Sequence, residues 1–379
     1  MIHTDPKMRT WAEIDLKALR HNFDIARSTG KKVMCVIKAD GYGHGAVELG
    51  KHLEQYGAYA FAVACLDEAL TLRDAGIKLP ILILGYTPAE YAGILAENRI
   101  TATIVDENAA LQMEQEAARQ DVSVQVHIKI DTGMSRLGFL AQTPEQIIKS
   151  ADAITRCAAY PHLKIEGMFT HFAVADTPTE DAYTSLQLAN YNAMKEALAQ
   201  RGISIPLCHA ANSAAIMEHP DAHFDMVREG IILYGLYPDS VPREKGPLHP
   251  VMTLKTRVAQ VKEYPEDVTI SYGRTFCTKQ PTKIAVLTVG YADGFPRRQS
   301  NQAIVTINGK EYRQIGRICM DMCMVDVTGS DVKRGDEVIL FGTGGCSLEQ
   351  VSENVGTINY ELCCLVTPRV PRVYQNTVK

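Results

Sequence analysis

The sequence lacks the features that would direct it to a membrane, to nucleic acid or out of the cell. It has no apolar run approaching the roughly 18 residues of a membrane-spanning helix, and its N-terminus has no apolar segment typical of a secretion signal. The formal net charge is -5 and like charges do not form runs, so neither an anionic membrane nor nucleic acid is expected as a partner. These absences favour a cytoplasmic protein.

Cysteine spacing gives no sign of a disulfide framework or a zinc site. The 10 cysteines are scattered through 379 residues, which favours reduced thiols, and they lack paired CxxC spacing. His44, His209 and His219 are not accompanied by HExxH or carboxylate-histidine spacing, so we interpret them as structural. No metal is expected.

Short apolar segments alternate with helical patterns from residue 33 onward, and eight of them fit buried strands. The predicted strands are 33–37, 59–64, 81–84, 101–105, 124–130, 164–170, 207–210 and 226–228. The helical patterns between them cover 45–56, 66–74, 88–98, 107–119, 143–157, 182–201 and 213–218. This α/β alternation over about 200 residues predicts a closed (β/α)8 barrel of the TIM type, with an open doubly wound sheet as the alternative.

The pattern changes after Gly235. The segment from Pro238 to Pro250 is rich in proline and glycine and is interpreted as a linker. Beyond it the helical period disappears, and strands are predicted at 252–261, 282–289, 303–307, 311–315, 322–327 and 336–341, followed by a short helix at 348–353. The sequence therefore predicts a barrel over residues 11–245 and a mainly β C-terminal domain over residues 246–379.

Lys38 lies where the first predicted barrel strand ends. Barrel enzymes place their chemistry at the carboxyl ends of the strands, and a lysine amine can form an imine with an aldehyde. Tyr42 is near enough in sequence to line the same mouth. The alternative is an ordinary solvated lysine.

Polar residues end several other predicted strands. They are Lys129, Asp131 and Arg136 in KIDTGMSRLG, His171 in GMFTHF, Asn212 and Ser213 in HAANSAA, and Arg228, Gly230 and Ile231 in VREGIILYG. The loops after the last two strands commonly bind phosphate in this fold. Ser213 and the Gly230–Ile231 backbone could bind a phosphate. A lysine and a phosphate site in one mouth suggest pyridoxal 5'-phosphate.

Ten motifs in order over essentially the whole chain carry a family resemblance. VIKADGYGHG, KIDTGMSRLG, THFAVAD, ANSAA, MVREGIILYG, SYGRTF, VGYADGF, GRICMDM, GDEVILFG and TINYE together resemble bacterial alanine racemase. The resemblance implies a fold-type III enzyme that binds pyridoxal 5'-phosphate and interconverts L- and D-alanine by a two-base mechanism, supplying D-alanine for peptidoglycan. It also implies a homodimer with shared active sites, in which residues 1–10 pack with the β domain.

The resemblance assigns two acid-base residues. Lys38 would hold the cofactor and act on one face of the substrate, and Tyr272 of the other subunit would act on the opposite face. A phenol titrates near pH ~10, so Tyr272 would need cationic or hydrogen-bond donors that favour its phenolate. In the family a chain of contacts runs from this tyrosine through His171 to Arg228, which meets the pyridine nitrogen.

The remaining roles also come from the resemblance. The phosphate would be held by Tyr42, Ser213, Gly230, Ile231 and Tyr360, with Asn212 beside it. Arg136 and the backbone of Met320 from the partner subunit would bind the substrate carboxylate. Lys129 matches a position that is often carbamylated, against the alternative of an unmodified lysine. Tyr291 and Asp321 would line the entrance, although a tyrosine in a β domain is more often a core residue.

Three rival functions stay open. One is the same reaction with a preference for serine or a broad range of amino acids, because one hydroxymethyl group changes binding by only a few kcal/mol. Another is a decarboxylase of the same fold type, which would need an acidic partner for the pyridine nitrogen where this chain has Arg228. The last is a non-catalytic carrier of pyridoxal phosphate built on a single barrel, which would lack Tyr272 and the β domain.

Overall fold

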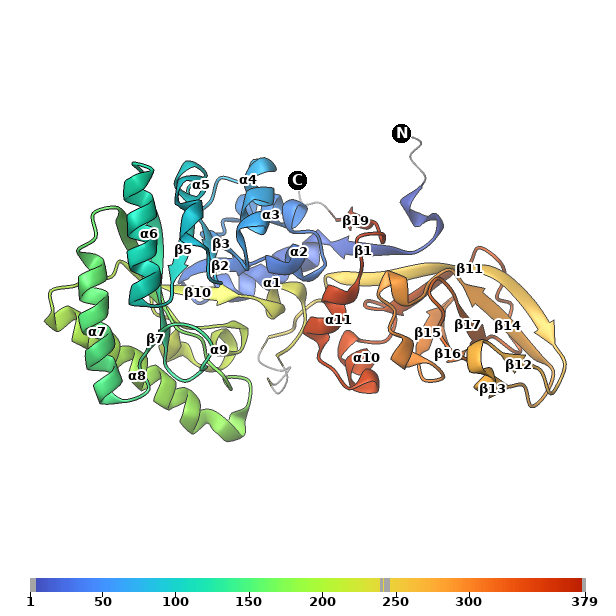
Figure 1. The fold of residues 1–379 in the computed structure, drawn as a ribbon. Coiled ribbons are helices and arrows are strands. Elements are labelled where there is room, and N and C mark those ends of the chain that lie inside the picture. The colour runs from blue at the N-terminus through green and yellow to red at the C-terminus, as the bar shows by residue number, and fades with distance from the viewer. Residues whose placement is uncertain (1–4, 239–240, 242–245, 377–379) are drawn as a thin grey trace.

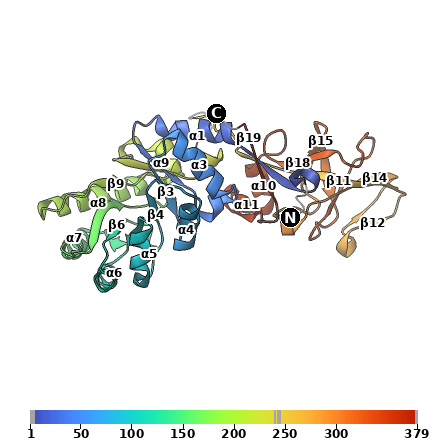
Figure 2. The same ribbon diagram turned by 90° about the horizontal axis from the view of Figure 1, so that it is seen from above.

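A computed structural model describes residues 5–238, 241 and 246–376 of the chain. The molecule is elongated, with a barrel at one end and a mainly antiparallel sheet at the other (Figure 1). The view from above shows the same separation, with α11 (Asn359–Leu365) on the side of the sheet that faces the barrel (Figure 2). Part of the predicted linker, including Pro242, lies outside the described residues.

Eight parallel strands form the barrel. In spatial order they are β10 (Met226–Glu229), β2 (Lys32–Val36), β3 (Ala60–Val63), β4 (Ile81–Ile83), β5 (Ile100–Ile104), β6 (Val124–Asp131), β8 (Leu163–Phe169) and β9 (Leu207–His209). The gap between β9 and β10 is bridged by backbone hydrogen bonds from Asp225 N to Cys208 O, 3.1 Å, and from Arg228 N to Ala211 O, 3.0 Å. The barrel prediction is confirmed, and all eight predicted strands are present.

Helices cover the outside of the barrel, and the longer ones pack against it through one buried face. They are α1 (Leu16–Arg27), α3 (Ala46–Tyr56), α4 (Leu66–Asp74), α5 (Ala92–Glu97), α6 (Glu107–Arg119), α7 (Pro144–Ala158), α8 (Asp181–Gln200) and α9 (Ser213–Glu218). In α1, for example, Leu16, Leu19 and Phe23 are fully buried. The pattern predicted over 88–98 is divided into a 3-10 turn, Ala89–Tyr91, and the short α5. No helix in the described part of the chain is long and apolar enough to cross a membrane.

The second sheet has the order β14-β17-β16-β15-β18-β11-β1-β19. Its strands are β11 (Met252–Tyr264), β14 (Thr282–Leu287), β15 (Ile304–Ile307), β16 (Lys310–Ile315), β17 (Cys323–Asp326), β18 (Glu337–Phe341), β1 (Trp11–Asp15) and β19 (Arg372–Gln375). A small hairpin, β12 (Thr269–Ile270) with β13 (Phe276–Cys277), stands apart from it, β7 (Phe139–Leu140) pairs with β6, and α10 covers Leu348–Val355. Asn308 and Gly309 both have positive φ, 51° and 76°, as a tight hairpin turn requires.

Strand β1 belongs to this second sheet, although the sequence-based division assigned residues 11–15 to the barrel. It pairs antiparallel with β11, Trp11 opposite Lys255, and parallel with β19, Ala12 opposite Arg372. Both partners lie hundreds of residues away, so the five-residue strand carries no local signal of its pairing. Residues before it also contact the sheet, since the Thr10 hydroxyl donates to Thr288 O, 2.7 Å; residues 1–4 lie outside the described part.

The barrel and the C-terminal elements meet at the loop that follows β2. Arg372 Nε donates to Gly43 O, 2.9 Å, and the Tyr374 hydroxyl donates to His44 O, 3.1 Å. His44 is buried, and its Nδ1–H donates to the carbonyl of Tyr42, 2.9 Å. Burial lowers the pKa of His44 from 6.5 to about 4, so the folded chain keeps this imidazole neutral.

We expect His44 to make the chain less stable in mild acid. As the pH falls below about 6.5 the unfolded chain protonates this histidine, whereas the folded chain does so only near pH 4, so the free energy of unfolding falls across that window. In His44→Asn the amide can donate to the same carbonyl without titrating. Denaturant unfolding at about pH 7 and pH 5 should show that the wild-type chain loses about 2 kcal/mol more than the variant. Equal losses in both would contradict the assignment.

Candidate active site

A cavity of about 620 Å³ opens at the carboxyl ends of the barrel strands. Eleven of the predicted site residues line it: Lys38, Tyr42, Lys129, Arg136, His171, Asn212, Ser213, Arg228, Gly230, Ile231 and Tyr360. They come from loops or strand ends of β2, β6, β8, β9 and β10, and Tyr360 comes from α11 of the C-terminal part. The fold therefore brings these residues, which are spread over 323 positions of the chain, to one mouth.

Lys38 begins an unusual turn. Ala39 and Asp40 adopt left-handed conformations, φ 52° and 51°, which cost non-glycine residues roughly 1–2 kcal/mol each. Two carboxylates hold the turn: Glu68 accepts from Ala39 N, 2.7 Å, and Asp40 accepts from Ala46 N, 2.8 Å. Because the surrounding contacts stabilise a strained backbone here, the position of Lys38 at the cavity wall is fixed by the fold.

The amine of Lys38 is biased toward its neutral form. Burial lowers its pKa from 10.5, and the positive charge of Arg136 lowers it further. A neutral amine is the form that attacks a carbonyl carbon or accepts a proton. The environment of Lys38 therefore favours both covalent chemistry and general-base chemistry.

Arg228 donates inside the barrel only to neutral acceptors. Its Nη2 donates to Thr170 O, 2.7 Å, to Ala210 O, 2.9 Å, and to Nδ1 of His171, 3.3 Å. Burial lowers the pKa of Arg228 to about 10, so its guanidinium stays charged at neutral pH. Glu229 is fully buried, and burial raises its pKa well above 4.5. Within the described residues no carboxylate pairs with Arg228, which is buried, so this arginine does not form a surface ion pair.

Hydroxyl groups converge on Gly230. A methyl group added at this glycine would lie 3.4 Å from the Ser213 hydroxyl oxygen and 3.5 Å from that of Tyr42. The Gly230 N–H donates to Ser213 Oγ, 3.0 Å, and the ring of Tyr360 lies 6.3 Å from that of Tyr42. Burial raises the pKa of Tyr42, so its hydroxyl remains a donor. This set of neutral donors beside a glycine suits a phosphate group.

Lys129 lies on the inner wall of the barrel. It is only 5% exposed, its Nζ is 4.7 Å from the centre of the Phe169 ring, and it has no hydrogen-bond partner among the described residues. Burial lowers its pKa well below 10.5, and the charges of Arg228 and Arg136 act in the same direction. Its surroundings therefore favour the neutral amine, and its Nζ lacks a hydrogen-bond partner among the described residues.

Four predicted residues do not line the cavity of their own chain. Tyr272 is 71% exposed, Met320 is 53% exposed and Tyr291 is 41% exposed, and all of them, like Asp321, belong to the C-terminal β part. Tyr291 N donates to Cys319 O, 3.1 Å, and Ala292 N donates to Met320 O, 3.1 Å, so Tyr291 and Met320 lie on adjacent loops. The placement of Tyr272 and Met320 matches the expectation that these two residues would act in the site of another copy, which stays a prediction, as does the entrance role of Tyr291 and Asp321.

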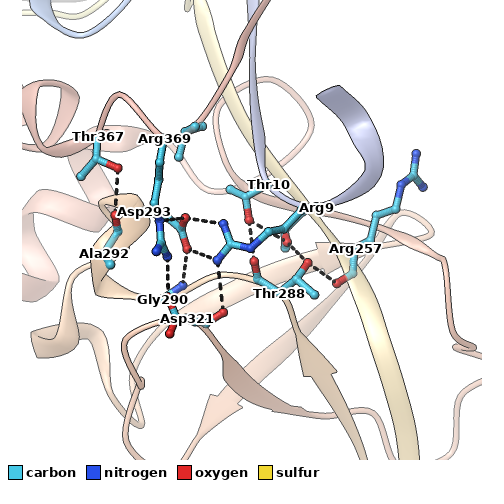
Figure 3. Close-up of polar contacts among 12 residues, drawn as sticks. Arg9, Thr10, Arg257, Thr288, Gly290, Ala292, Asp293, Asp321, Thr367 and Arg369 are labelled. Carbon is cyan, nitrogen blue, oxygen red and sulfur yellow. Dashed lines mark hydrogen bonds and ion pairs between the residues drawn. The ribbon is translucent and has the colours of Figure 1, made fainter. Parts of the chain in front are cut away.

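Asp293 holds these loops through an ion-pair network centred on its buried carboxylate (Figure 3). Its carboxylate is fully buried and accepts from Arg9, 2.6 and 2.9 Å, from Arg369, 2.7 Å, and from Gly290 N, 2.9 Å. Arg369 also donates to Asp321, 2.8 Å. Burial alone would raise the pKa of Asp293, but the hydrogen bonds from both arginines lower it overall.

We expect Asp293→Asn to destabilise the protein by about 2 kcal/mol, because it removes the charge from a buried acceptor of hydrogen bonds from two arginines. Asp321→Asn is the matched control: Asp321 is exposed, and loss of an exposed pair should cost under about 1 kcal/mol. Thermal or denaturant unfolding measures both. Equal losses would show that the buried carboxylate is not the centre of the network.

Sequence reasoning missed some residues of the site. Phe169, which lies under Lys129 and Arg228, was hidden in an apolar run. His209 was interpreted as structural, but its Nδ1 accepts from Arg228 Nη1, 3.0 Å. Its position at the end of the seventh predicted strand was a signal that could have identified it.

Two families of known protein domains match successive parts of the chain. Residues 14–238 match the family described as "Alanine racemase, N-terminal domain", and residues 251–374 match "Alanine racemase, C-terminal domain". The chain belongs to the alanine racemase family. The alanine racemase of Methanococcus maripaludis is 47% identical over 372 residues, covering 96% of this chain and 98% of that protein.

Solved structures support the same family. The alanine racemase of Clostridium difficile 630 has a TM-score of 0.92 at 42% identity, covering 98% of this chain and 96% of that one. The alanine racemase from Bacillus anthracis with bound L-Ala-P has a TM-score of 0.88 at 34% identity, covering 98% of this chain and 96% of that one. Membership of the alanine racemase family confirms the resemblance carried by the ten motifs and the prediction of an enzyme of the racemase class.

Proposed function

We propose that this chain interconverts L- and D-alanine with pyridoxal 5'-phosphate as cofactor and supplies D-alanine for peptidoglycan. The observation that carries the proposal is the single cavity in which Lys38, Arg228, His171 and the hydroxyls around Gly230 meet. Membership of the alanine racemase family supports the choice of reaction.

The residues present fit pyridoxal phosphate. Tyr42, Ser213, Gly230 and Ile231, with Tyr360 from α11, would hold the phosphate, and the amine of Lys38 would hold the aldehyde carbon. Bound in this way, the cofactor would supply an electron sink that acidifies the α-hydrogen of an amino acid. Asn212 lines the same cavity and caps α9 by accepting from Ala215 N, 3.0 Å, which keeps Ser213 at the start of that helix.

Arg228 supports racemisation over decarboxylation. A guanidinium has donors only, so a ring nitrogen that meets it would be held as an acceptor and would stay unprotonated. An acid at this place would strengthen the electron sink and broaden the range of reactions. The acceptors around Arg228 are neutral carbonyls and imidazoles, so none of its hydrogen-bond partners among the described residues neutralises its charge.

Racemisation needs acid-base groups on both faces of the substrate. Lys38 would serve one face, and we assign the other to Tyr272 of a second copy in a homodimer, together with Met320 of that copy at the substrate carboxylate beside Arg136. The high exposure of Tyr272 and Met320 in this chain supports a role outside it. Tyr291 and Asp321, held on the same face by the Asp293 network, would line the entrance.

We expect Lys129 to be carbamylated, because burial favours its neutral amine, which is the form that attacks carbon dioxide, and the product would be an anion that interacts with the positive charges of Arg136 and Arg228. Its nitrogen would form a bond to the carbon of CO2 and release one proton. Incubation with carbon-13-labelled bicarbonate should give a carbamate NMR signal in the wild-type protein and none in Lys129→Met. An identical spectrum from both proteins would contradict the modification.

Steady-state kinetics test the function. The purified protein with pyridoxal phosphate should form D-alanine from L-alanine and the reverse, with kcat/KM for alanine exceeding the values for serine and lysine. A higher value for serine would overturn the substrate assignment. Release of CO2 without a change of configuration would instead support the decarboxylase alternative.

A further inference from the structure

Three buried side chains form a hydrogen-bonded chain that runs from the cavity wall across the interior of the barrel. Arg228 on β10 contacts His209 on β9, with Nη1 3.0 Å from Nδ1. His209 contacts His127 on β6, with Nε2 3.0 Å from Nδ1. The three side chains are 3%, 0% and 4% exposed, and His127 does not line the cavity.

The chemistry of the guanidinium fixes the direction of every hydrogen bond in this chain of side chains. Arg228 has only donors, so Nδ1 of His209 accepts. Burial, together with the charge of Arg228, lowers the pKa of His209 well below 6.5 and that of His127 to about 3, so both rings are neutral. His209 therefore carries its proton on Nε2 and donates it to Nδ1 of His127.

Arg228 also fixes the tautomer of His171, on the cavity side, because a ring nitrogen that contacts a guanidinium must accept. Nδ1 of His171 accepts from Arg228 Nη2, 3.3 Å, and the neutral ring then carries its proton on Nε2. The orientation of Arg228 thus determines which nitrogen of His171 is a donor. Anything that releases Arg228 from His209 also disturbs His171.

We propose that His127 is a positioning residue that locks His209 in the tautomer that accepts from Arg228. The proposal rests on the proposed function and deepens it. Without an acceptor at His127, the Nε2 proton of His209 would be buried and unpaired, and moving it to Nδ1 would aim a donor at the donors of Arg228. Either result weakens the contact of Arg228 Nη1 with His209 and so loosens one side of the guanidinium, which also contacts His171 and would meet the ring nitrogen of the cofactor.

The packing around His127 leaves space for its imidazole ring. Gly167 on β8 leaves room for it, since a methyl group there would lie 2.5 Å from Cε1 of His127. Phe169 stacks on His209 at 5.0 Å with an interplanar angle of 6°. The rings are therefore held in place by contacts that are independent of the hydrogen bonds.

The matched variants are His127→Asn and His127→Leu. The amide oxygen of asparagine can take the place of Nδ1 and accept from His209, whereas leucine has a similar size and no acceptor. We expect the leucine variant to lose about tenfold in kcat with little change in the KM for alanine, and the asparagine variant to stay within about twofold of wild type. Equal kcat losses in both variants would overturn the proposal, because a purely structural role does not distinguish them.

A second readout does not depend on turnover. Nitrogen-15 NMR of histidine-labelled protein, with the His209 signals assigned from their loss in His209→Asn, should show protonated Nε2 and unprotonated Nδ1 in the wild type and in His127→Asn, and a mixture in His127→Leu. The same tautomer in all three proteins would overturn the proposal even if the enzyme is active. If the wild type does not racemise alanine, the proposed function fails, and this measurement still decides the role of His127.

Discussion

Lys38→Ala is expected to abolish racemisation, with kcat reduced by about 10⁴-fold or more. The variant loses both the covalent attachment of the cofactor and the base on one face of the substrate. The visible absorbance of the lysine-bound cofactor should disappear with the activity. Because Lys38 lies at the cavity wall and not in the apolar core, the folded chain should keep its stability.

Far-ultraviolet circular dichroism provides the control for folding of this variant. Added methylamine supplies an external amine in place of the lysine amine, and it tests whether the missing amine causes the loss of activity. A variant that retained both the activity and the absorbance of wild type would show that the cofactor is held elsewhere.

Tyr272→Phe is expected to lower kcat by about 10²- to 10⁴-fold, because it removes one hydroxyl that exchanges a proton with the substrate. Tyr272 is 71% exposed, so the free energy of unfolding should change by less than about 0.5 kcal/mol. The loss of proton exchange should be selective for one face of the substrate. In deuterated water the variant should still exchange the α-hydrogen of one alanine enantiomer, while exchange of the other enantiomer falls with kcat.

Equal residual exchange of both enantiomers would contradict the assignment of Tyr272 to a single face. Tyr291→Phe is a suitable control, because that tyrosine is also exposed and lies in the same part of the chain. Its removal should affect entry of substrate, and therefore KM, more than the face-selective exchange.

The barrel could be predicted from the sequence because strands such as β2, β3 and β4 carry continuous apolar runs, which are typical of strands buried on both faces. In β3, for example, Ala60 to Val63 are all buried, and the residue after such a run lies at the mouth of the barrel by geometry alone. This is why Lys38 could be located before its surroundings were known.

Contacts between distant segments could not be predicted in the same way. Strand β1 has no local property that selects β11 and β19 as its neighbours, and Arg9 gives no sign that it will pair with Asp293, 284 positions later. The hydrogen-bonded chain from Arg228 through His209 to His127 joins three strands, and these residues come into contact only when the barrel closes.

The most direct measurement is activity in hybrid dimers formed by mixing Lys38→Ala with Tyr272→Phe. If each active site takes Lys38 from one copy and Tyr272 from the other, each hybrid contains one intact site and one doubly altered site. Random exchange of subunits should then restore about a quarter of wild-type activity, although each variant alone has almost none. No gain over the two separate variants, under conditions where exchange is shown to occur, would contradict a site shared between two copies.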